Sequence, residues 1–410
     1  MTFPVIGVVG GGQLARMMAP EAIGLGFELR ILAEAEDVSA VAAVRSAPVG
    51  DYRDLDTLRR FAAGVDVLTF DHEHVPNEHL HVLIEEGVNV QPRPAALIHA
   101  QDKLVMRAAI ERLGLPNPEW SAVSSVIELR AFGEEIGWPV VLKTPTGGYD
   151  GKGVRIVDGP AAAEDCADWF GDGPLLAEAK VGFTRELSAL VARTPDGRSA
   201  AWPVVHTIQV DGVCDEVIAP APGLATEVAR TAQETALRIA DAFDVTGVMA
   251  AELFETPGHG AGFVVNELAM RPHNTGHWTM NGSVTSQFEQ HLRAVLGLPL
   301  GDTAALGGYS VMKNYLGGAN EDLYSAFPAA LAAEPRAKIH AYGKSVRPGR
   351  KIGHVNVVGL PGEDPGTVRA RAGRAAAIIR DGREPAAGPA ATTPAGTDGS
   401  PVPATGGTLA

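Results

Sequence analysis

The chain has 410 residues, enough for two or three domains, and its 45% apolar and 20% charged residues are typical of a soluble globular protein. Its net charge of −15 argues against a nucleic-acid partner, and no apolar run reaches the ~18–20 residues that cross a membrane. The N-terminus does not resemble a signal peptide, and Cys166 and Cys214 are the only cysteines, so we expect a cytoplasmic protein.

Strands and helices alternate through the first hundred residues. The β-rich runs are 5–9, 28–32 and 66–70, and the helical patterns are 13–26, 54–64 and 78–87. Such alternation predicts βαβ units and a parallel sheet.

The stretch 91–103 is punctuated by Pro92 and Pro94 and is interpreted as a domain boundary. A second α/β region follows it, and a third region ends in the helical pattern 368–381. The last residues, 385–410, are rich in Pro, Gly, Ala and Thr and have almost no large apolar side chains, so this tail is expected to be disordered.

The first glycine-rich segment, GVVGGGQLARM, follows a predicted strand and precedes a predicted helix. Gly10, Gly12 and Ala15 match the dinucleotide-binding pattern, and Glu34 follows the second strand as the acidic residue of that pattern. Three interpretations are open: a nicotinamide dinucleotide site, a site for another phosphate at a helix N-terminus, or a structural turn.

The second glycine-rich segment, TGGYDGKG at 146–153, follows a strand-like run that ends at Lys143. Glycine lets backbone N–H groups approach an anion closely, so the loop could cradle a phosphate. A hairpin turn is an equal alternative, because Asp150-Gly151 is a strong turn pair. Gly153 follows Lys152 where a P-loop needs Ser or Thr, which excludes that motif.

Glu252 and Glu267 lie in apolar, strand-like segments, where an unpaired charge is costly. If the two strands are neighbours, the carboxylates lie side by side with Asn266 next to the second. Such oxygen ligands suit Mg²⁺, which commonly bridges substrate phosphates. Ion pairs with Arg or Lys are the alternative.

Two further segments carry histidines. In RPHNTGH (271–277), Pro272 and Gly276 argue against a helix, so we do not expect His273 and His277 to bind zinc, and the loop is better suited to holding an anion or moving a proton. The segment DHEH at 71–74 is interpreted as a polar loop, with a metal site as the alternative.

The segment YGKSVRPGRKIGH (342–354) is basic in an acidic chain. Lys344, Arg347, Arg350 and Lys351 fall close together, which indicates a phosphate partner, with a solvated turn as the alternative.

Six segments occur in one order: VGGGQLARM, QDKLVMR, VVLKTPTGGYDGKG, EAKVGFTRELS, NELAMRPHNTGH and YGKSVRPGRKIGHVN. Together they resemble the 5-(carboxyamino)imidazole ribonucleotide synthases, ATP-grasp enzymes of purine biosynthesis, from about residue 4 to 382. The resemblance implies an α/β ATP-grasp fold and a homodimer. Its parts would be a Rossmann-like pre-ATP-grasp domain (1–100), the ATP-grasp domain (101–304), a small C-terminal domain (305–384) and the tail (385–410).

The resemblance also implies a reaction. ATP phosphorylates bicarbonate to carboxyphosphate, and the carboxylate passes to the exocyclic amine of 5-aminoimidazole ribonucleotide (AIR), leaving ADP and phosphate. The glycine-rich loop would close over the triphosphate, which suits an intermediate that is unstable in water.

Residue roles follow from the same resemblance. ATP binding falls to Lys103, Lys143, Gly148, Tyr149, Asp150, Gly151, Lys152, Gly153, Glu178, Glu186, Asn266 and Glu267. The resemblance assigns the binding of Mg²⁺, or of Mn²⁺ in its place, to Glu252 and Glu267. It assigns the binding of bicarbonate and carboxyphosphate to Arg271 and His273. These two residues and Lys344 are the predicted catalytic residues. AIR binding falls to Gly12, Gln13, Tyr149, Asp150, Lys344, Arg350 and Lys351.

Three features depart from the family pattern. Lys103 stands where relatives often carry Arg, Gln209 stands where some carry His, and an addition near TPGHGAG lengthens a turn that we expect to lie in solvent. The alternatives are a sister ATP-grasp enzyme such as the formate-dependent glycinamide ribonucleotide transformylase, a nicotinamide-dependent oxidoreductase, and a non-catalytic nucleotide-binding regulator.

Overall fold

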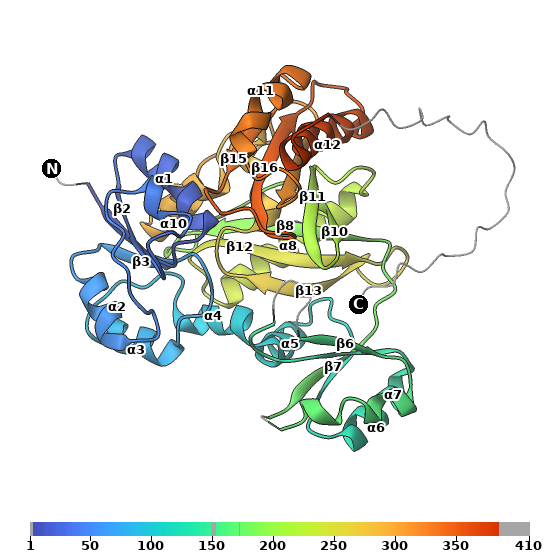
Figure 1. Cartoon of the computed structure of the whole chain (residues 1–410). Coiled ribbons are helices and arrows are strands. Elements are labelled where there is room, and N and C mark those ends of the chain that lie inside the picture. Colours follow the sequence, from blue (N-terminus) through green and yellow to red (C-terminus); the bar gives the residue numbers. More distant parts are fainter. Residues whose placement is uncertain (1–2, 149–152, 172, 385–410) are drawn as a thin grey trace, which may run out of the picture.

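The computed structural model describes residues 3–148, 153–171 and 173–384. Tyr149, Asp150, Gly151 and Lys152, which the sequence assigns to the nucleotide loop, lie outside these residues, as does the tail 385–410. Figure 1 shows a central sheet with the N-terminal region at one side, a smaller sheet below it and the C-terminal helices above it. No helix of the described ranges is long and apolar enough to cross a membrane.

The N-terminal region contains the predicted parallel sheet. Its strands are β1 (Val5–Val9), β2 (Glu28–Leu32) and β3 (Val67–Phe70), in the order β2-β1-β3. The helices are α1 (Gln13–Leu25), α2 (Leu55–Ala62) and α3 (Asn77–Glu85). Val9 is in register with Leu32 and Phe70, so the carboxyl ends of all three strands, and the loops that follow them, meet at one edge.

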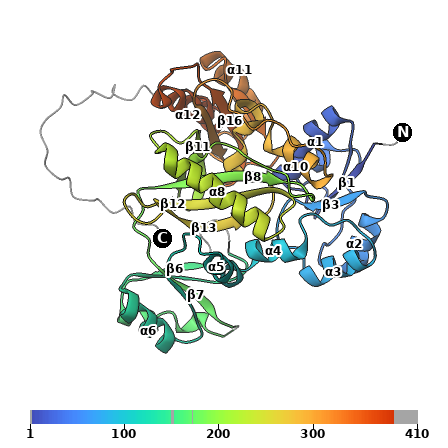
Figure 2. The same ribbon diagram turned by 180° about the vertical axis from the view of Figure 1, so that it is seen from behind.

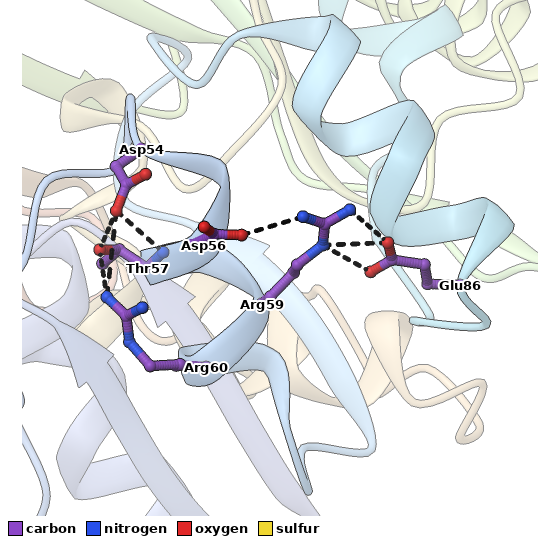
Figure 3. A network of polar contacts seen from close by, with 6 residues as sticks. All are labelled: Asp54, Asp56, Thr57, Arg59, Arg60 and Glu86. Carbon is purple, nitrogen blue, oxygen red and sulfur yellow. Dashed lines mark hydrogen bonds and ion pairs between the residues drawn. The ribbon is translucent and has the colours of Figure 1, made fainter.

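Helix α2 illustrates how local sequence sets an element's limits (Figure 3). Asp54 caps its N-terminus by accepting hydrogen bonds from the N–H and the hydroxyl of Thr57. Arg59 bridges Asp56 and Glu86 and so ties α2 to the end of α3. These side chains are exposed, so the buried Leu58 and Phe61, and not the ion pairs, account for most of the docking energy.

Two helices lead from the first region to the second. The helix α4 (Pro94–Gln101) begins with proline at its first position, and α5 (Lys103–Arg112) follows it after a single residue. That residue, Asp102, accepts hydrogen bonds from the N–H groups of Leu104 and Val105, which fixes the start of α5 and the place of Lys103.

A four-stranded antiparallel sheet comes next. Its strands are β4 (Trp120–Val123), β5 (Val140–Lys143), β6 (Val154–Val157) and β7 (Leu175–Ala179), in the order β4-β7-β5-β6. The helices α6 (Val126–Ile136) and α7 (Pro160–Glu164) cover it. Because β5 and β6 are antiparallel neighbours, the glycine-rich loop connects the two strands of a hairpin. Its ends are joined by a 2.9 Å hydrogen bond from the Thr144 N–H to the Gly153 carbonyl.

The central sheet has nine strands and is antiparallel throughout. They are β8 (Arg185–Arg193), β9 (Ser199–Ala201), β10 (Val205–Val210), β11 (Val213–Ala219), β12 (Gly247–Glu255), β13 (Phe263–Ala269), β14 (Ser310–Leu316), β15 (Lys338–Ala341) and β16 (Lys351–Val358). The order is β13-β12-β8-β10-β11-β14-β16-β15, with β9 paired to β8. The strand β14 lies in the predicted C-terminal domain, which begins at residue 305, and it pairs with β11 of the predicted ATP-grasp domain. The central sheet is therefore continuous across this predicted boundary.

Helices cover this sheet in separate groups. The helix α8 (Thr226–Ala242) packs against β8 and β12, as the view from behind in Figure 2 shows. The helices α11 (Leu323–Ala333) and α12 (Pro365–Asp381) cover the C-terminal strands. The short α9 (Thr279–Gly282) and α10 (Gln287–Val295) follow the RPHNTGH segment, and α10 packs on α1, which joins the first region to the second.

Candidate active site

The paired carboxylates lie directly opposite each other, as the sequence predicts. Glu252 of β12 is in register with Glu267 of β13, and a β-bulge follows, so that Asn266 is an extra residue on β13. Arg107 of α5, which is buried, donates to the carbonyls of Val265 (2.7 Å) and Asn266 (2.8 Å) and so satisfies them.

The electrostatics of this pair favour a cation. Burial raises the pKa of Glu252 to about 8, and the nearby charges of Glu267 and Glu186 add to the effect. Two opposed carboxylates are an incomplete cage, and within the described residues no cluster of three or more His, Cys, Asp or Glu side chains could hold a metal. Mg²⁺ commonly binds through one or two carboxylates plus substrate phosphates, so Glu252 and Glu267 fit such an ion.

Two lysines approach the carboxylates from the small sheet and from α5. Lys143, at the end of β5, places its Nζ 2.7 Å from Glu178 Oε2 and 3.5 Å from Asn266 Oδ1. Lys103 places its Nζ 3.2 Å from Glu267 Oε1. Five of the predicted ATP-binding side chains, those of Lys103, Lys143, Glu178, Asn266 and Glu267, therefore form one connected cluster.

Glu178 is buried on β7 between two cations. Burial alone would raise its pKa, but Lys143 and Arg107 outweigh that effect and hold the pKa below its usual range. The role of Arg107 was missed in the sequence, although it lies in the segment QDKLVMR. An arginine in an otherwise amphipathic helix carries no pattern that shows it will be buried.

Glu186 lies on the same face of the sheet as Glu252. Burial raises its pKa, while a hydrogen bond from Gln209 lowers it. Gln209, which the sequence treats as a departure, thus contacts a predicted site residue. In sheet register Glu186 is opposite Phe254, whose ring stacks on the half-exposed Phe183 with centroids 4.4 Å apart. This pair of rings was not predicted, and it offers a flat apolar surface beside the carboxylates.

Arg271 and His273 lie on the other side of the carboxylates. His273 Nε2 is 3.3 Å from Glu252 Oε1, and its Nδ1 is 2.9 Å from Thr275 Oγ1. Burial lowers the pKa of His273 to about 3, with further lowering by Arg271 and Lys351, so its ring is neutral at pH 7. The segment contains the short 3₁₀ turn Asn274–Gly276 and no α-helix at 273–277, in agreement with the loop interpretation.

The segment DHEH was interpreted as a polar loop, and the structure places it in the site. Glu73 Oε2 accepts a 2.6 Å hydrogen bond from Arg271 Nε, and its other oxygen accepts from the N–H of Met270. Asp71 accepts from the N–H groups of Gly12 (3.0 Å) and Ala15 (2.7 Å). Its position after the last strand of a parallel sheet, at the carboxyl edge, was the signal that could have identified it.

The turn GGGQ binds carboxylates of its own chain. Besides the bonds to Asp71, the N–H of Gly11 donates to Glu34 Oε2 at 3.0 Å. A Cβ on Gly12 would lie 2.0 Å from Asp71 Oδ2, so only glycine fits there. The structural interpretation of the dinucleotide-like pattern is therefore sufficient, because the N–H groups of Gly11, Gly12 and Ala15 already have anionic partners.

The predicted AIR residues from the two ends of the chain meet beside this turn. Lys344 Nζ donates to Gln13 Oε1, which is adjacent to Gly12. Burial lowers the pKa of Lys344, Asp71 opposes that effect, and Arg350 and Lys351 reinforce it. Asp71, Arg350 and Lys351 are therefore near enough to act electrostatically on the Lys344 ammonium group.

The lengthened turn near TPGHGAG was expected to lie in solvent. It also lines an open cleft of about 720 Å³. The lining residues are Gly114, Leu115, Pro116, Asn117, Val181, Gly182, Thr256, His259, Gly260, Ala261, Phe263 and Val264. The cleft lies beside the segment that connects β7 to β8, outside the cluster of carboxylates.

A small antiparallel sheet that carries Lys143, a large one that carries the paired carboxylates, and the helix between them that carries Lys103 define an ATP-grasp enzyme. Family models agree with this class. The chain matches the ATP-grasp domain at residues 108–288, the ribonucleotide synthetase preATP-grasp domain at 3–101, and the phosphoribosylaminoimidazole carboxylase C-terminal domain at 310–364.

Comparison with individual proteins identifies the family within the ATP-grasp class. The chain is 52% identical over 361 residues to the N5-carboxyaminoimidazole ribonucleotide synthase of Mycobacterium tuberculosis, covering 87% of this chain and 84% of that one. It is 50% identical over 383 residues to the same enzyme of Corynebacterium ammoniagenes, covering 92% of both chains. The Aspergillus clavatus enzyme solved with ADP and 5-aminoimidazole ribonucleotide has a TM-score of 0.82 and 30% identity, covering 92% of this chain and 98% of that one.

The chain belongs to the N5-carboxyaminoimidazole ribonucleotide synthases, the ATP-dependent ligases that carboxylate 5-aminoimidazole ribonucleotide in purine biosynthesis.

Proposed function

We propose that this chain joins bicarbonate to AIR through carboxyphosphate, with the site residues in the roles that follow. One observation carries the proposal. The carboxylates of Glu252 and Glu267 lie between the lysine cluster of Lys103 and Lys143 and the group formed by Arg271 and His273. A phosphoryl group held at the carboxylates would therefore face a nucleotide on one side and an anionic acceptor on the other.

The nucleotide would lie between the small sheet and the large one. Phe183 and Phe254 would supply an apolar surface for the adenine, and Glu186, which is opposite Phe254 in the sheet, would bind the ribose hydroxyls. Lys143 would exchange part of its contact with Glu178 for a phosphate oxygen. Mg²⁺ held by Glu252 and Glu267 would supply neutralisation of the triphosphate charge, and Mn²⁺ has the same ligand preference.

Bicarbonate would bind at Arg271 and His273. An oxygen of bicarbonate attacks the γ-phosphorus, the bond from that phosphorus to ADP breaks, and carboxyphosphate forms. Arg271, held by Glu73, presents a fixed guanidinium to the anion. The neutral ring of His273 can donate one hydrogen bond without carrying charge of its own.

AIR would bind where Gln13, Lys344, Arg350 and Lys351 meet. Its exocyclic amine attacks the carboxyl carbon of carboxyphosphate, the bond to phosphate oxygen breaks, and the amine loses a proton. The basic residues would hold the ribonucleotide phosphate, since Lys and Arg are suited to that group. A homodimer, a cytoplasmic location and the division into domains at 100, 304 and 384 belong to the same proposal.

The proposal is tested by ADP release from ATP with Mg²⁺, measured with and without bicarbonate and AIR. We expect formation that depends on both, and a loss of roughly 100-fold or more in Glu267→Ala, because the cation loses a ligand. The more conservative Glu267→Gln keeps the side-chain volume and should be nearly as inactive, while both variants keep the thermal unfolding midpoint within a few degrees. ATP turnover that ignores AIR would contradict the proposal.

A further inference from the structure

The side-chain amide of Gln287 forms two hydrogen bonds with the backbone of His273. Gln287 is the first residue of α10 and has 0% exposure. Its Oε1 accepts a hydrogen bond from the His273 N–H at 2.8 Å, and its Nε2 donates to the His273 carbonyl at 2.8 Å. Both polar groups of one residue of the loop are thus bound by one side-chain amide.

The orientation of this amide is fixed by its partners. A backbone N–H can only donate and a carbonyl can only accept, so the oxygen and nitrogen of Gln287 cannot be exchanged. The same Nε2 lies 2.9 Å from His277 Nδ1, which therefore acts as an acceptor. The backbone N–H of Gln287 donates to Thr279 Oγ1 at 2.9 Å, which anchors the glutamine itself.

The loop also fits closely around this amide. A Cβ on Gly276 would lie 2.3 Å from Gln287 Oε1, so glycine is required for the approach. On its other side the loop is held by Ser188, whose hydroxyl is 2.8 Å from Thr275 Oγ1, the partner of His273 Nδ1. The imidazole of His273 therefore has its backbone fixed by Gln287 and its ring fixed by Thr275.

We infer that Gln287 is a positioning residue for carboxyphosphate formation, acting by holding His273 beside Glu252. The inference rests on the proposed function, because it concerns the bicarbonate site of that reaction. Without the amide, the two backbone groups of His273 lose their partners and the loop must shift to find others. A shift of about 1 Å at a reacting group can lower a rate by up to 10²-fold.

The chain contains a closely matched control. Gln290 lies one turn further along α10 and also has 0% exposure. Its side-chain amide binds the backbone of Gly301 in the same way. The Oε1 accepts a hydrogen bond from the Gly301 N–H at 2.7 Å, and the Nε2 donates to the Gly301 carbonyl at 3.0 Å. Removing either amide breaks two part-buried hydrogen bonds to the backbone of one loop residue, and Gln287 also loses its contact with His277. Only the bonds of Gln287 are made to a residue of the site.

The test compares Gln287→Met with Gln290→Met in the full chain. We expect Gln287→Met to lower kcat/KM for bicarbonate at least tenfold and to change KM for ATP less than threefold. Gln290→Met should lower the unfolding midpoint by a similar amount and change both kinetic constants less than twofold. Equal kinetics of the two folded variants, with an active wild type, would overturn the inference and leave the proposed function intact.

A second measurement does not depend on turnover. Hydrogen exchange of the His273 amide should be at least tenfold faster in Gln287→Met than in wild type and unchanged in Gln290→Met. Unchanged exchange of the His273 amide in both variants would overturn the inference, whether or not the wild type is active. An inactive wild type would by itself count against the proposed function alone. If Gln287→Met does not fold, Gln287→Asn, which retracts the amide by one methylene, is expected to show the same pattern at smaller amplitude, and wild-type kinetics and exchange in that variant would overturn the inference.

Discussion

Glu73 contacts a predicted active-site arginine from another region of the chain. Its carboxylate accepts from both Arg271 Nε and the Met270 N–H, and the pair is largely buried, with side-chain exposures of 12% for Glu73 and 23% for Arg271. A buried guanidinium that loses its counter-charge is free to adopt other orientations and is costly to keep.

The variant Glu73→Gln removes this charge and keeps one of the two oxygens that accept hydrogen bonds. We expect kcat/KM for bicarbonate to fall by about 10- to 100-fold because Arg271 is no longer held in one direction. The control is Glu334→Gln, which breaks an Arg–Glu pair of similar burial with Arg371 in the C-terminal region. Steady-state kinetics at varied bicarbonate would distinguish the two, and equal losses would mean that Glu73 acts on stability alone.

Individual residues were predictable to the extent that they stand out against their surroundings. Glu252 and Glu267 are charges in apolar strands, so the sequence identifies both. Arg107 and Glu73 lie among other polar residues, and their burial depends on contacts with β13 and with Arg271 that no local pattern contains. A contact between residues more than 150 positions apart cannot be derived from the sequence around either residue alone.

The turn between β1 and α1 is an element whose sequence pattern has a structural cause. Its N–H groups bind Glu34 and Asp71, which follow β2 and β3 at the same edge of the sheet. The loops of all three strands are therefore linked through this turn, and Gln13, which contacts Lys344, is oriented by it.

Replacement of Gly12 by Ala should disrupt this arrangement. Its Cβ would meet Asp71 Oδ2 at 2.0 Å, so we expect a loss of about 1–3 kcal/mol in the free energy of unfolding. Gly24 lies in α1 and has no atom within 4 Å of an added Cβ, so Gly24→Ala should be stabilising by roughly 0.5–1 kcal/mol. Urea unfolding of both variants checks the contrast, and a neutral Gly12→Ala would refute the close fit.

Elements were predicted better than their irregularities. The alternation of strands and helices predicted the parallel sheet, whereas the pairing of β12 with β13 entered only as a condition for placing the two carboxylates side by side, and the structure shows it to be antiparallel. The bulge at Asn266 has no glycine or other signal in the sequence, since Arg107 stabilises it from outside the strand. Tertiary contacts of this kind decide the details that local propensity leaves open.

At the scale of the whole molecule, one buried histidine joins three parts. His291 of α10 accepts from the N–H of Val248 in β12 and lies 2.9 Å from the hydroxyl of Thr69 in β3. Because its Nδ1 is an acceptor, its Nε2 carries the proton and donates to Thr69. Burial lowers the pKa of His291 to about 3.

This histidine makes stability depend on pH. In the unfolded chain its pKa is about 6.5, so between pH 6.5 and about 3 the unfolded state binds one more proton, and stability falls as the pH falls. Each such group contributes a slope of at most about 1.4 kcal/mol per pH unit. Burial also lowers the pKa of His206 and His340 to about 4, which acts in the same direction.

The variant His291→Gln isolates one of these groups. Its unfolding free energy should change less steeply between pH 6.5 and 4.5 than that of the wild type, by up to about 1.4 kcal/mol per pH unit. The comparison cancels groups that are unchanged, such as Glu252, whose raised pKa gives a contribution of opposite sign. Parallel stability curves from denaturation at several pH values would show that His291 has the same pKa in the folded and unfolded protein, and would contradict the prediction.

The continuity of the central sheet has a consequence for how the chain is made. The strand β14 pairs with β11, so the edge of β11 has no partner until residues 310–316 have left the ribosome. The nascent protein thus exposes an open strand edge while the predicted nucleotide-binding residues are already synthesised, and such an edge can pair with other chains. Addition of the C-terminal strands therefore closes the strand edge along which incomplete chains would associate.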